Sequence, residues 1–301
     1  MSKILVTGGA GFIPSHLIDA LVKDNHEVTS VDNFVTGKEE NLSTKDNHRF
    51  IKADVNNLDE IEPIIRNGKY EYIFHYAALV GVHRTINNPI GVLNDLSGLE
   101  NLFSLAKETK VRKIFFSSSS EVYGEPVELP QREYLTPLNS RLPYAVIKNV
   151  GECFCKSYKQ EHGLDYTIFR FFNTYGLRQS EDFVVSKFLK LAKENKDITV
   201  YGTGLQTRTF CYIDDHIEAT TKAFKENIYN NEIVNIGNNE ETTILQLAET
   251  IIKILDSKSK IIHLDPLAEG DMTRRQPDVE RMKSLLNRDF TTLEKGLKKI
   301  I

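Results

Sequence analysis

The stretch KILVTGGAGFIPSHL, residues 3–17, decides the fold of this chain. Residues 4–7 are apolar or β-branched, as in a strand, and they lead directly into a cluster of three glycines, Gly8, Gly9 and Gly11. Apolar residues then recur at helical spacing over residues 17–22, so the stretch predicts a strand, a tight turn and a helix. Such a turn aims a helix N-terminus, with its free N–H groups, at an anion such as a diphosphate. We therefore expect a dinucleotide site here.

One residue departs from this pattern. The dinucleotide fingerprint G-x-G-x-x-G/A places a small residue at position 14, where this chain has Pro14. Proline is tolerated in the first turn of a helix, because its missing N–H has no intrahelical acceptor there. Its ring, however, fills space that the third glycine normally clears. We expect a locally displaced helix start and weaker retention of the dinucleotide than a glycine gives.

The composition is that of a globular protein of 301 residues with a net charge of −4. No basic run is present, which disfavours a nucleic-acid partner. No apolar run approaches the ~18 residues that a membrane helix needs, and the start of the chain lacks the pattern of a signal peptide. We expect a cytoplasmic protein with no membrane partner and no metal site. Its three cysteines, Cys153, Cys155 and Cys211, are expected to be reduced structural thiols.

Strand and helix patterns alternate through the first half of the chain. Strands are predicted at residues 28–31, 50–53, 72–78, 114–116 and 167–172, and two of the helices at residues 92–106 and 144–162. Asp32 ends the second strand 21 residues beyond Gly11, where an acidic side chain accepts hydrogen bonds from an adenosine ribose. The alternation predicts an α/β fold, a Rossmann-type doubly wound parallel sheet with its ligands at the carboxyl ends of the strands.

The second half is less regular. Helices are predicted at residues 183–193, 215–224 and 244–255, short strands at 234–236 and 261–264, and helices at the C-terminal end. We expect residues 1–172 to form the dinucleotide-binding domain with the catalytic helix. Residues 173–301 then form mainly a smaller C-terminal substrate-binding lobe, from which some segments return to the first domain.

The sharpest catalytic signal is YAVIK, in which Tyr144 and Lys148 lie four residues apart and so on one face of a helix. A nearby ammonium and a cationic nicotinamide both favour the phenolate, which could then take a hydroxyl proton while hydride leaves the same carbon. The strand at 114–116 runs into four serines, and Ser119 stands 25 residues before the tyrosine. A hydroxyl in that place suits a group that holds the substrate oxygen.

At this point the sequence resembles the extended short-chain dehydrogenase/reductase family, in its nucleotide-sugar epimerase, dehydratase and decarboxylase group. The resemblance covers nearly the whole chain. It is carried by TGGAGFI at residues 7–13, VDNF at 31–34, ADV at 53–55, HYAA at 75–78, SSSSEVYGEP at 117–126, YAVIK at 144–148, RFFNTYG at 170–176, VYGTGLQTRTFCYIDD at 200–215, VNIGN at 234–238 and RRQPD at 274–278.

The resemblance implies NAD as a cofactor that is kept and recycled. A carboxylate at Asp32 also repels the additional phosphate of NADP. The implied contacts are Gly8, Gly11, Phe12 and Ile13 at the pyrophosphate, Asp32 and Asn33 at the adenosine ribose, Asp54 and Val55 at the adenine, Ala77 and Ser117 at the nicotinamide side, and Tyr144 and Lys148 beside the nicotinamide and its ribose.

For catalysis, the resemblance implies Tyr144 as the base, Lys148 as the group that lowers its pKa, Ser119 as the catalytic hydroxyl, and Glu121 beside them. The implied substrate is a nucleotide-diphosphate sugar, with UDP as the expected nucleotide. The residues implied to bind it are Val82, Ser119, Asn173, Arg208, Arg274 and Arg275. An arginine fork suits a diphosphate because it offers paired charged donors.

The reaction is left with three alternatives, all of which begin by oxidation of a sugar carbon, usually C4. We place a 4-epimerase first, since it needs no further acid. A UDP-glucuronate decarboxylase comes second: Ser119 and Glu121 fit it, but the residues between Tyr144 and Lys148 do not. A 4,6-dehydratase comes last, because Ser120 stands where that group carries an aspartate. In an epimerase, Glu121 could simply satisfy local backbone donors.

Two further expectations concern binding alone. Some proteins of this fold bind a dinucleotide without catalysis, and Pro14 keeps that reading open for this chain. The resemblance also implies a homodimer in which the helices at 92–106 and 144–162 of two copies form a four-helix bundle.

Overall fold

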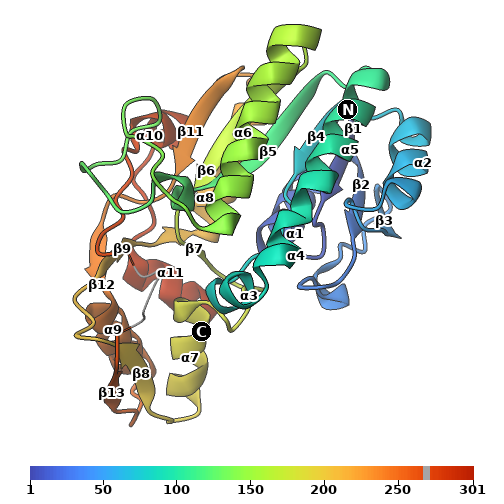
Figure 1. The fold of residues 1–301 in the computed structure, drawn as a ribbon. Helices are drawn as coiled ribbons and strands as arrows, with labels where there is room; N and C mark the ends of the chain where they lie inside the picture. Colours follow the sequence, from blue (N-terminus) through green and yellow to red (C-terminus); the bar gives the residue numbers. More distant parts are fainter. Residues whose placement is uncertain (267–271) are drawn as a thin grey trace.

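The computed structural model describes residues 1–266 and 272–301, without the side chains of residues 82, 83 and 86. A seven-stranded sheet forms the centre of the larger part of the molecule, with six strands from residues 3–171 and a seventh, β11, from residues 232–236 (Figure 1). Its strand order is β11-β6-β5-β4-β1-β2-β3, and every neighbouring pair is parallel. The strands are β1 (Lys3–Thr7), β2 (Glu27–Asp32), β3 (His48–Lys52), β4 (Tyr72–His75), β5 (Lys113–Ser119), β6 (Asp165–Phe171) and β11 (Glu232–Ile236).

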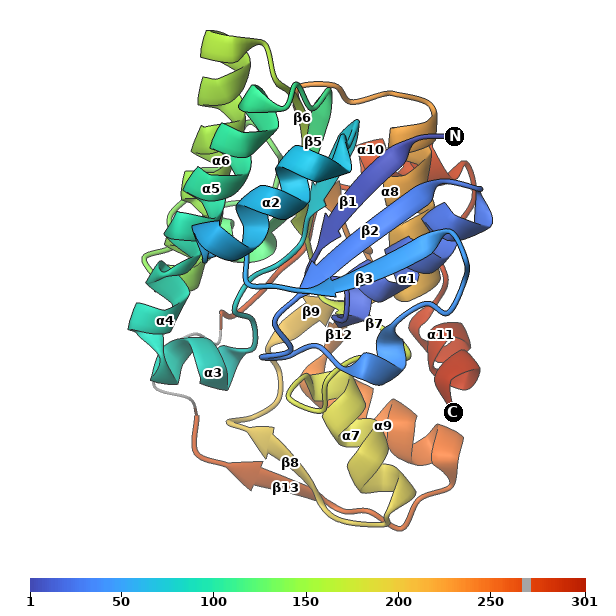
Figure 2. The same ribbon diagram turned by 90° about the vertical axis from the view of Figure 1, so that its right-hand side faces the viewer.

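Helices cover both faces of this sheet, which confirms the predicted doubly wound α/β fold. Figure 2 shows α2, α5 and α6 on one side, and α1, α8 and α10 on the other. The first group is α2 (Leu58–Gly68), α5 (Asp95–Glu108) and α6 (Pro143–His162), and the second is α1 (Phe12–Lys23), α8 (Ile213–Lys225) and α10 (Glu280–Leu286). The order of the strands reverses between β1 and β4, the point where ligands bind in such sheets.

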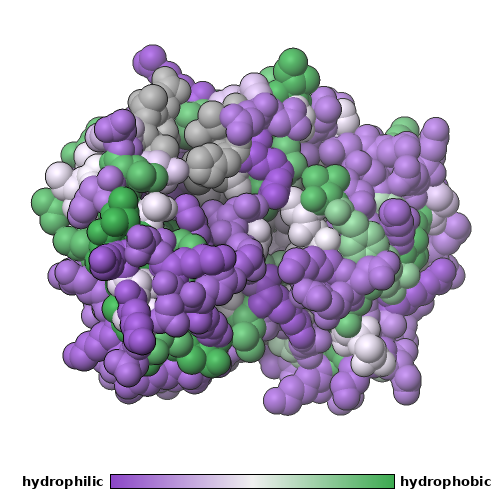
Figure 3. Space-filling view, turned by 90° about the horizontal axis from the view of Figure 1, so that it is seen from below, coloured by the Kyte–Doolittle hydropathy of each residue, from purple (hydrophilic) through white to green (hydrophobic). Residues whose placement is uncertain are grey.

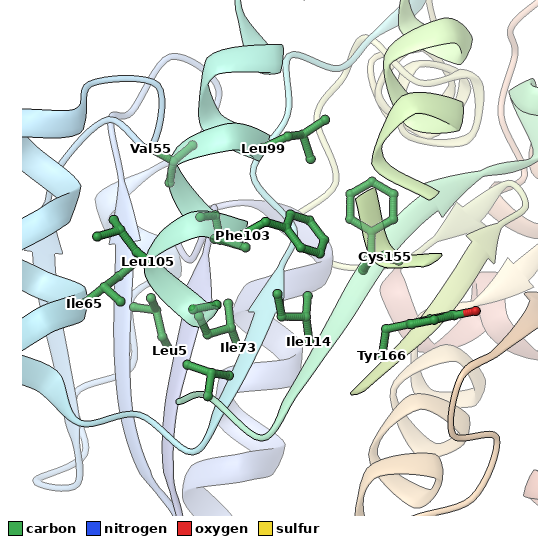
Figure 4. Packing of buried hydrophobic residues seen from close by; sticks show 14 of the residues in the cluster. Leu5, Val55, Ile65, Ile73, Leu99, Phe103, Leu105, Ile114, Cys155 and Tyr166 are labelled. Carbon is green, nitrogen blue, oxygen red and sulfur yellow. The ribbon is translucent and has the colours of Figure 1, made fainter. Parts of the chain in front are cut away.

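Two hydrophobic clusters fill the space between the sheet and these helices. Figure 4 shows one of them, in which Phe103 and Leu105 of α5 lie over Ile73 and Ile114 of the sheet. On the other face, Leu17, Ile18 and Leu21 of α1 are almost fully buried, because the helix turns its whole apolar stripe toward the strands.

A smaller lobe lies beyond the carboxyl ends of the strands, toward which the arrows of β1 and β2 point in Figure 2. It contains α7 (Val184–Lys193), α9 (Ile244–Leu255) and α11 (Leu293–Ile300), with three two-stranded sheets. These sheets pair β7 (Thr174–Tyr175) with β10 (Cys211–Tyr212), β9 (Thr207–Thr209) with β12 (Glu241–Thr243), and β8 (Ile198–Tyr201) with β13 (Ile261–Leu264). Seen from the lobe end, the surface is mostly hydrophilic (Figure 3). The division of the chain after residue 172 stays a prediction.

The predicted strand at 72–78 is shorter in the structure and ends at His75. The N–H groups of Tyr76 and Ala77 donate to the Thr7 hydroxyl, at 3.1 Å each, and not to a neighbouring strand. The Thr7 hydroxyl thus takes the place of the acceptors of a neighbouring strand, and the strand pairing of β4 ends there.

The predicted helix at 92–106 is divided into α4 (Pro89–Leu93) and α5. Asn88 begins α4 earlier than expected, since its side chain accepts the N–H of Gly91 at 3.1 Å. Asn94 separates the two helices. Asparagine is a poor helix former, because its side chain competes with the backbone for hydrogen bonds.

Two other predictions concern cysteines and membranes. All three cysteines are unpaired, with Cys155 and Cys211 buried and Cys153 exposed, as expected for reduced structural thiols. Within residues 1–266 and 272–301, no helix is long and apolar enough to cross a membrane.

Candidate active site

The glycine turn connects β1 to α1 at the carboxyl edge of the sheet. Gly8 has a φ of +74°, and a Cβ there would lie 2.9 Å from the backbone of Ala77, so only glycine fits. The N–H groups of Gly8 and Gly9 donate to Val31 O at 2.8 and 3.0 Å, which fixes the turn to β2. No side chain among the described residues caps α1, so its first N–H groups face outward and suit the pyrophosphate of a dinucleotide.

Pro14 occupies the third position of α1, which begins at Phe12. The first helical hydrogen bond runs from the Ser15 N–H to Gly11 O at 3.2 Å, so the proline removes no bond of the helix. The helix therefore starts directly after the glycine turn with Pro14 in place. The expected loss of dinucleotide retention stays a prediction.

Asp32 ends β2 beside this turn and is largely buried. Its carboxylate accepts the N–H groups of Ala10 at 3.0 Å and Phe34 at 2.7 Å. Burial raises the pKa of Asp32, and these two hydrogen bonds act in the opposite direction. Asp32 therefore holds the backbone of the turn, in a position that also suits a ribose hydroxyl.

The two residues expected at the adenine, Asp54 and Val55, have different surroundings. Asn33 Nδ2 donates to Asp54 Oδ2 at 3.0 Å, which places these two side chains together beyond β2 and β3. Val55 is instead part of the hydrophobic cluster in Figure 4. Its side chain is buried in the core, and not exposed on the expected adenine side.

The expected nicotinamide side is a buried polar layer between β4, β5 and α6. Lys148 Nζ donates to Ser117 O at 2.7 Å and to Ser117 Oγ at 3.2 Å. Burial lowers the pKa of Lys148 to about 8. Burial and the charge of Lys148 lower the pKa of His75 to about 3, so this imidazole is neutral at pH 7 and lies 2.8 Å from the Thr7 hydroxyl.

Tyr144 lies on α6 one turn before Lys148, whose Nζ is 5.8 Å from the centre of the phenol ring. Burial, and after it the charge of Glu121, raise the pKa of Tyr144, while its hydrogen bond with Ser119 acts in the opposite direction. The net direction is opposite to the expected lowering by Lys148, because the ammonium is turned toward Ser117 and burial dominates. A cationic nicotinamide is the charge that NAD supplies when it is bound, and it favours the phenolate.

Ser119 ends β5 and begins the short helix η2 (Ser120–Tyr123), because its hydroxyl accepts the Glu121 N–H at 3.2 Å. The side chain of Glu121 meets Arg275, whose Nη2 lies 2.7 Å from Glu121 Oε1. Arg275 is only 5% exposed, and its Nε also contacts Met272 Sδ at 3.2 Å. Glu121 Oε2 is buried without a hydrogen-bond partner among the described residues. This carboxylate therefore serves an arginine, and not the local backbone donors considered above.

The neighbouring Arg274 points elsewhere. Its guanidinium makes two hydrogen bonds with Glu241 on β12, at 3.0 and 2.6 Å, and is half exposed. Side chains of consecutive residues in an extended chain point to opposite sides. The structure thus separates the two arginines that the sequence assigned together to the substrate.

The remaining expected substrate residues lie where the sheet meets the lobe. Asn173 follows β6, and its Nδ2 donates to Thr209 O at 3.5 Å. Arg208, on β9, is buried and donates to Thr207 O at 2.7 Å. The side chain of Val82, the sixth expected residue, is outside the described part of the chain.

The sequence missed Asp95, which stands in the first turn of α5. Its carboxylate accepts the Leu79 N–H at 2.9 Å and the amide of Asn56 at 3.2 Å. Its charge raises the pKa of Tyr144 and opposes the lowering of the pKa of Lys148. A signal could have been found in the polar group that interrupts the apolar pattern at residues 94–95.

Comparison with known proteins also indicates an NAD-dependent enzyme that acts on nucleotide sugars. Residues 4–237 match the model of the NAD dependent epimerase/dehydratase family. The chain is 38% identical over 307 residues to UDP-glucuronic acid decarboxylase 1 of Danio rerio, covering 99% of this chain and 72% of that protein. It is 35% identical over 314 residues to UDP-N-acetyl-alpha-D-glucosaminuronate decarboxylase of Bacillus cytotoxicus, covering 99% and 96%.

Among solved structures, it is similar to the UDP-glucose 4-epimerase of Thermotoga maritima with UDP-glucose. The TM-score is 0.93 at 31% identity, and the match covers 99% of this chain and 97% of the other. The relatives thus include both decarboxylases and an epimerase. The glycine turn, the acidic end of β2 and the Ser119, Tyr144 and Lys148 group fit NAD as the cofactor. The chain belongs to the NAD-dependent epimerase/dehydratase family of nucleotide-sugar enzymes.

Proposed function

We propose that this protein decarboxylates a UDP-linked uronic acid through a 4-keto sugar. The single observation that carries the proposal is the ion pair of the buried Arg275 with the partly exposed Glu121, whose charges both act on Tyr144. Burying a guanidinium is costly unless it is paired, and a neutral sugar has no charge at C6 for a cation to bind. A carboxylate at C6 does, and an arginine is the side chain best suited to bind it. This consideration moves the decarboxylase ahead of the epimerase that we placed first from the sequence.

In the proposed reaction, Ser119 holds the C4 oxygen and Tyr144 takes the C4 hydroxyl proton. When bound, NAD would supply the acceptor for the hydride from C4 and the source from which that hydride is returned. The C4 ketone makes the C6 carboxylate a β-keto acid, so the C5–C6 bond breaks, carbon dioxide leaves, and its bonding electrons pass to the C4 oxygen. Arg275 orients the carboxylate and Glu121 holds the guanidinium. A proton from water added at C5 then restores the ketone, which becomes an alcohol when the hydride returns to C4 and Tyr144 gives its proton to the C4 oxygen.

The contacts inferred from the family resemblance complete the proposal. Asp32 and Asn33 hold the adenosine ribose of NAD, with Asp54 near the adenine, and Asn173 and Arg208 hold the diphosphate of the substrate. Arg208 supports this assignment because its guanidinium is buried where the lobe meets the sheet. Arg274 is not included, since its guanidinium is bound by Glu241.

Incubation with UDP-glucuronate, UDP-glucose and UDP-N-acetylglucosamine in separate reactions, followed by NMR, tests the proposal. We expect a UDP-pentose and carbon dioxide from UDP-glucuronate alone. Conversion of UDP-glucuronate to UDP-galacturonate without loss of carbon, or of UDP-glucose to UDP-galactose, contradicts it.

A 4-epimerase is the second candidate. It is supported by the complete Ser119, Tyr144 and Lys148 group, which is all that a 4-epimerase requires, and by the fold shared with the Thermotoga enzyme. A dehydratase stays behind both because Ser120 replaces its aspartate. A dinucleotide-binding protein without catalysis predicts that none of the three sugars gives a product or a transient NADH absorbance.

We also propose that two copies pair through α5 and α6. Leu93, Leu96 and Val146 are exposed where α4, α5 and α6 lie against one another. Exposed apolar side chains gathered on neighbouring helices are typical of an interface. Light scattering that gives the mass of one chain contradicts the homodimer.

We further propose that the protein is cytoplasmic. Cell fractionation tests this location.

A further inference from the structure

Residues 272–278, here named the Arg275 segment, are fixed at several points along their length. The Thr273 N–H lies 3.3 Å from both carboxylate oxygens of Glu125, and the Thr273 hydroxyl donates to the same carboxylate. On its other side, Thr273 O accepts the Thr207 N–H of β9 at 3.1 Å. Gln131 then accepts the Asp278 N–H at 2.8 Å and donates its own N–H to Gln276 O at 2.7 Å.

These contacts alternate along the segment. Thr273 and Arg275 both face the loop that follows β5, where they meet Glu125 and Glu121. Arg274, between them, faces β12 and binds Glu241. The hydrogen bonds of Thr273 thus hold the segment two residues before Arg275, whose guanidinium meets Glu121.

The two glutamates are held together by a tight turn. Gly124 lies between them with a φ of +68°, and a Cβ there would lie 2.8 Å from Ser140 N. Glu121 and Glu125 thus present two carboxylates to the segment at a fixed spacing, one to the buried arginine and one to the exposed threonine.

We propose that Glu125 is a positioning residue that sets the place of Arg275 and with it the preference for a uronate over a neutral sugar. This inference rests on the proposed decarboxylase function. Among the described residues, the side-chain hydrogen bonds of Glu125 all go to Thr273, and Glu125 acts by holding that residue. Because Glu125 and Thr273 are exposed, water competes with their hydrogen bonds, and the effect has the size of about one such bond.

Glu125→Gln and Thr273→Val test the inference from its two sides, and Glu128→Gln is the matched control. Glu128 lies on the same loop, is also exposed, and accepts the Thr136 hydroxyl at 2.8 Å. We expect kcat/KM for UDP-glucuronate to fall about three- to tenfold in the two test variants. The Kd for UDP should stay the same, and Glu128→Gln should resemble the wild type.

Two measurements separate positioning from a general loss of structure. Hydrogen exchange of the Thr273 amide should accelerate in Glu125→Gln, while the Asp278 amide, held by Gln131, should not change. In an Arg275→Met background, Glu125→Gln should cause no further loss of activity, because the residue through which it acts is gone.

The outcomes also separate this inference from the proposed function. A wild-type protein that releases no carbon dioxide overturns the function, while the exchange measurement still decides whether Glu125 holds the segment. Two results with a wild type that decarboxylates would show that the positioning role is wrong. In one, Glu125→Gln has the same activity as Glu128→Gln. In the other, Glu125→Gln weakens the binding of UDP by the same factor as it lowers kcat/KM.

Discussion

The proposed cofactor side and the proposed sugar side of the site are built in different ways. The glycine turn, Asp32 and Ala77 are joined by backbone hydrogen bonds and close packing, within consecutive strand and helix units of one sheet. The sugar side joins Glu121 to Arg275 and Asn173 to β9, by side chains that come from distant parts of the chain. Cofactor binding, which enzymes of one fold can share, is placed here on a rigid local scaffold. Substrate selection depends on a few long-range contacts, which can change from one enzyme to another.

The largest effect is expected for the group that both reactions share. Tyr144→Phe removes the base and should lower kcat about 10²–10⁴-fold with every substrate. NAD content and thermal stability should stay near those of the wild type. Tyr158→Phe, on the same helix, is the control. Substantial activity in Tyr144→Phe would falsify the assignment of the base.

The next effect should be confined to the sugar side. Arg275→Met should lower carbon dioxide release from UDP-glucuronate about 100-fold, the scale of losing a charged hydrogen bond to the substrate. It also leaves the carboxylate of Glu121 without its cation, which should lower the free energy of unfolding by about 1–3 kcal/mol. Adding Glu121→Gln should restore part of that stability and none of the activity.

Arg274→Met is the matched control for this prediction. Its ion pair with Glu241 is half exposed, so little change in activity or stability is expected. Equal losses of activity in the two arginine variants contradict the separation of their roles.

A pH profile examines Lys148. Its pKa of about 8 means that the ammonium is lost as the pH rises through that value. If the charge supports catalysis, kcat/KM should fall about tenfold per pH unit above pH ~8, and Lys148→Met should be slower and lack this limb. The sign for stability is opposite: burial of the ammonium is unfavourable below pH ~8, and this cost is relieved as the pH rises from there toward the ordinary lysine pKa. If kcat/KM still falls at high pH in Lys148→Met, a group other than Lys148 causes that fall.

The smallest effect is expected at the cofactor turn. Pro14→Gly should raise NAD occupancy and affinity severalfold, because it clears the space beside the glycine turn, with little change in the preference among sugars. Isothermal titration and the NAD content of the purified protein measure this. Unchanged affinity means that the proline is neutral.

The difference between the two sides also explains how far the sequence could be interpreted. The glycine turn, the end of β2 and the Tyr144–Lys148 pair are defined by neighbours in the chain, so spacing alone indicated their places. The partner of Glu121 could not be predicted in this way, since it depends on the side to which Arg275 turns in the fold. The end of β4 was missed for a similar reason, because the hydroxyl of Thr7 in another strand replaces its ladder.

The place of β11 has a consequence for how the protein is made. This strand pairs with β6 at the edge of the sheet, although it is synthesised long after β6. Until it emerges from the ribosome, the growing chain has an open, largely apolar strand edge for several seconds. We expect truncation before β11 to give an aggregating product and not a free dinucleotide-binding unit. A shortened chain would thus report on the order in which the sheet is completed.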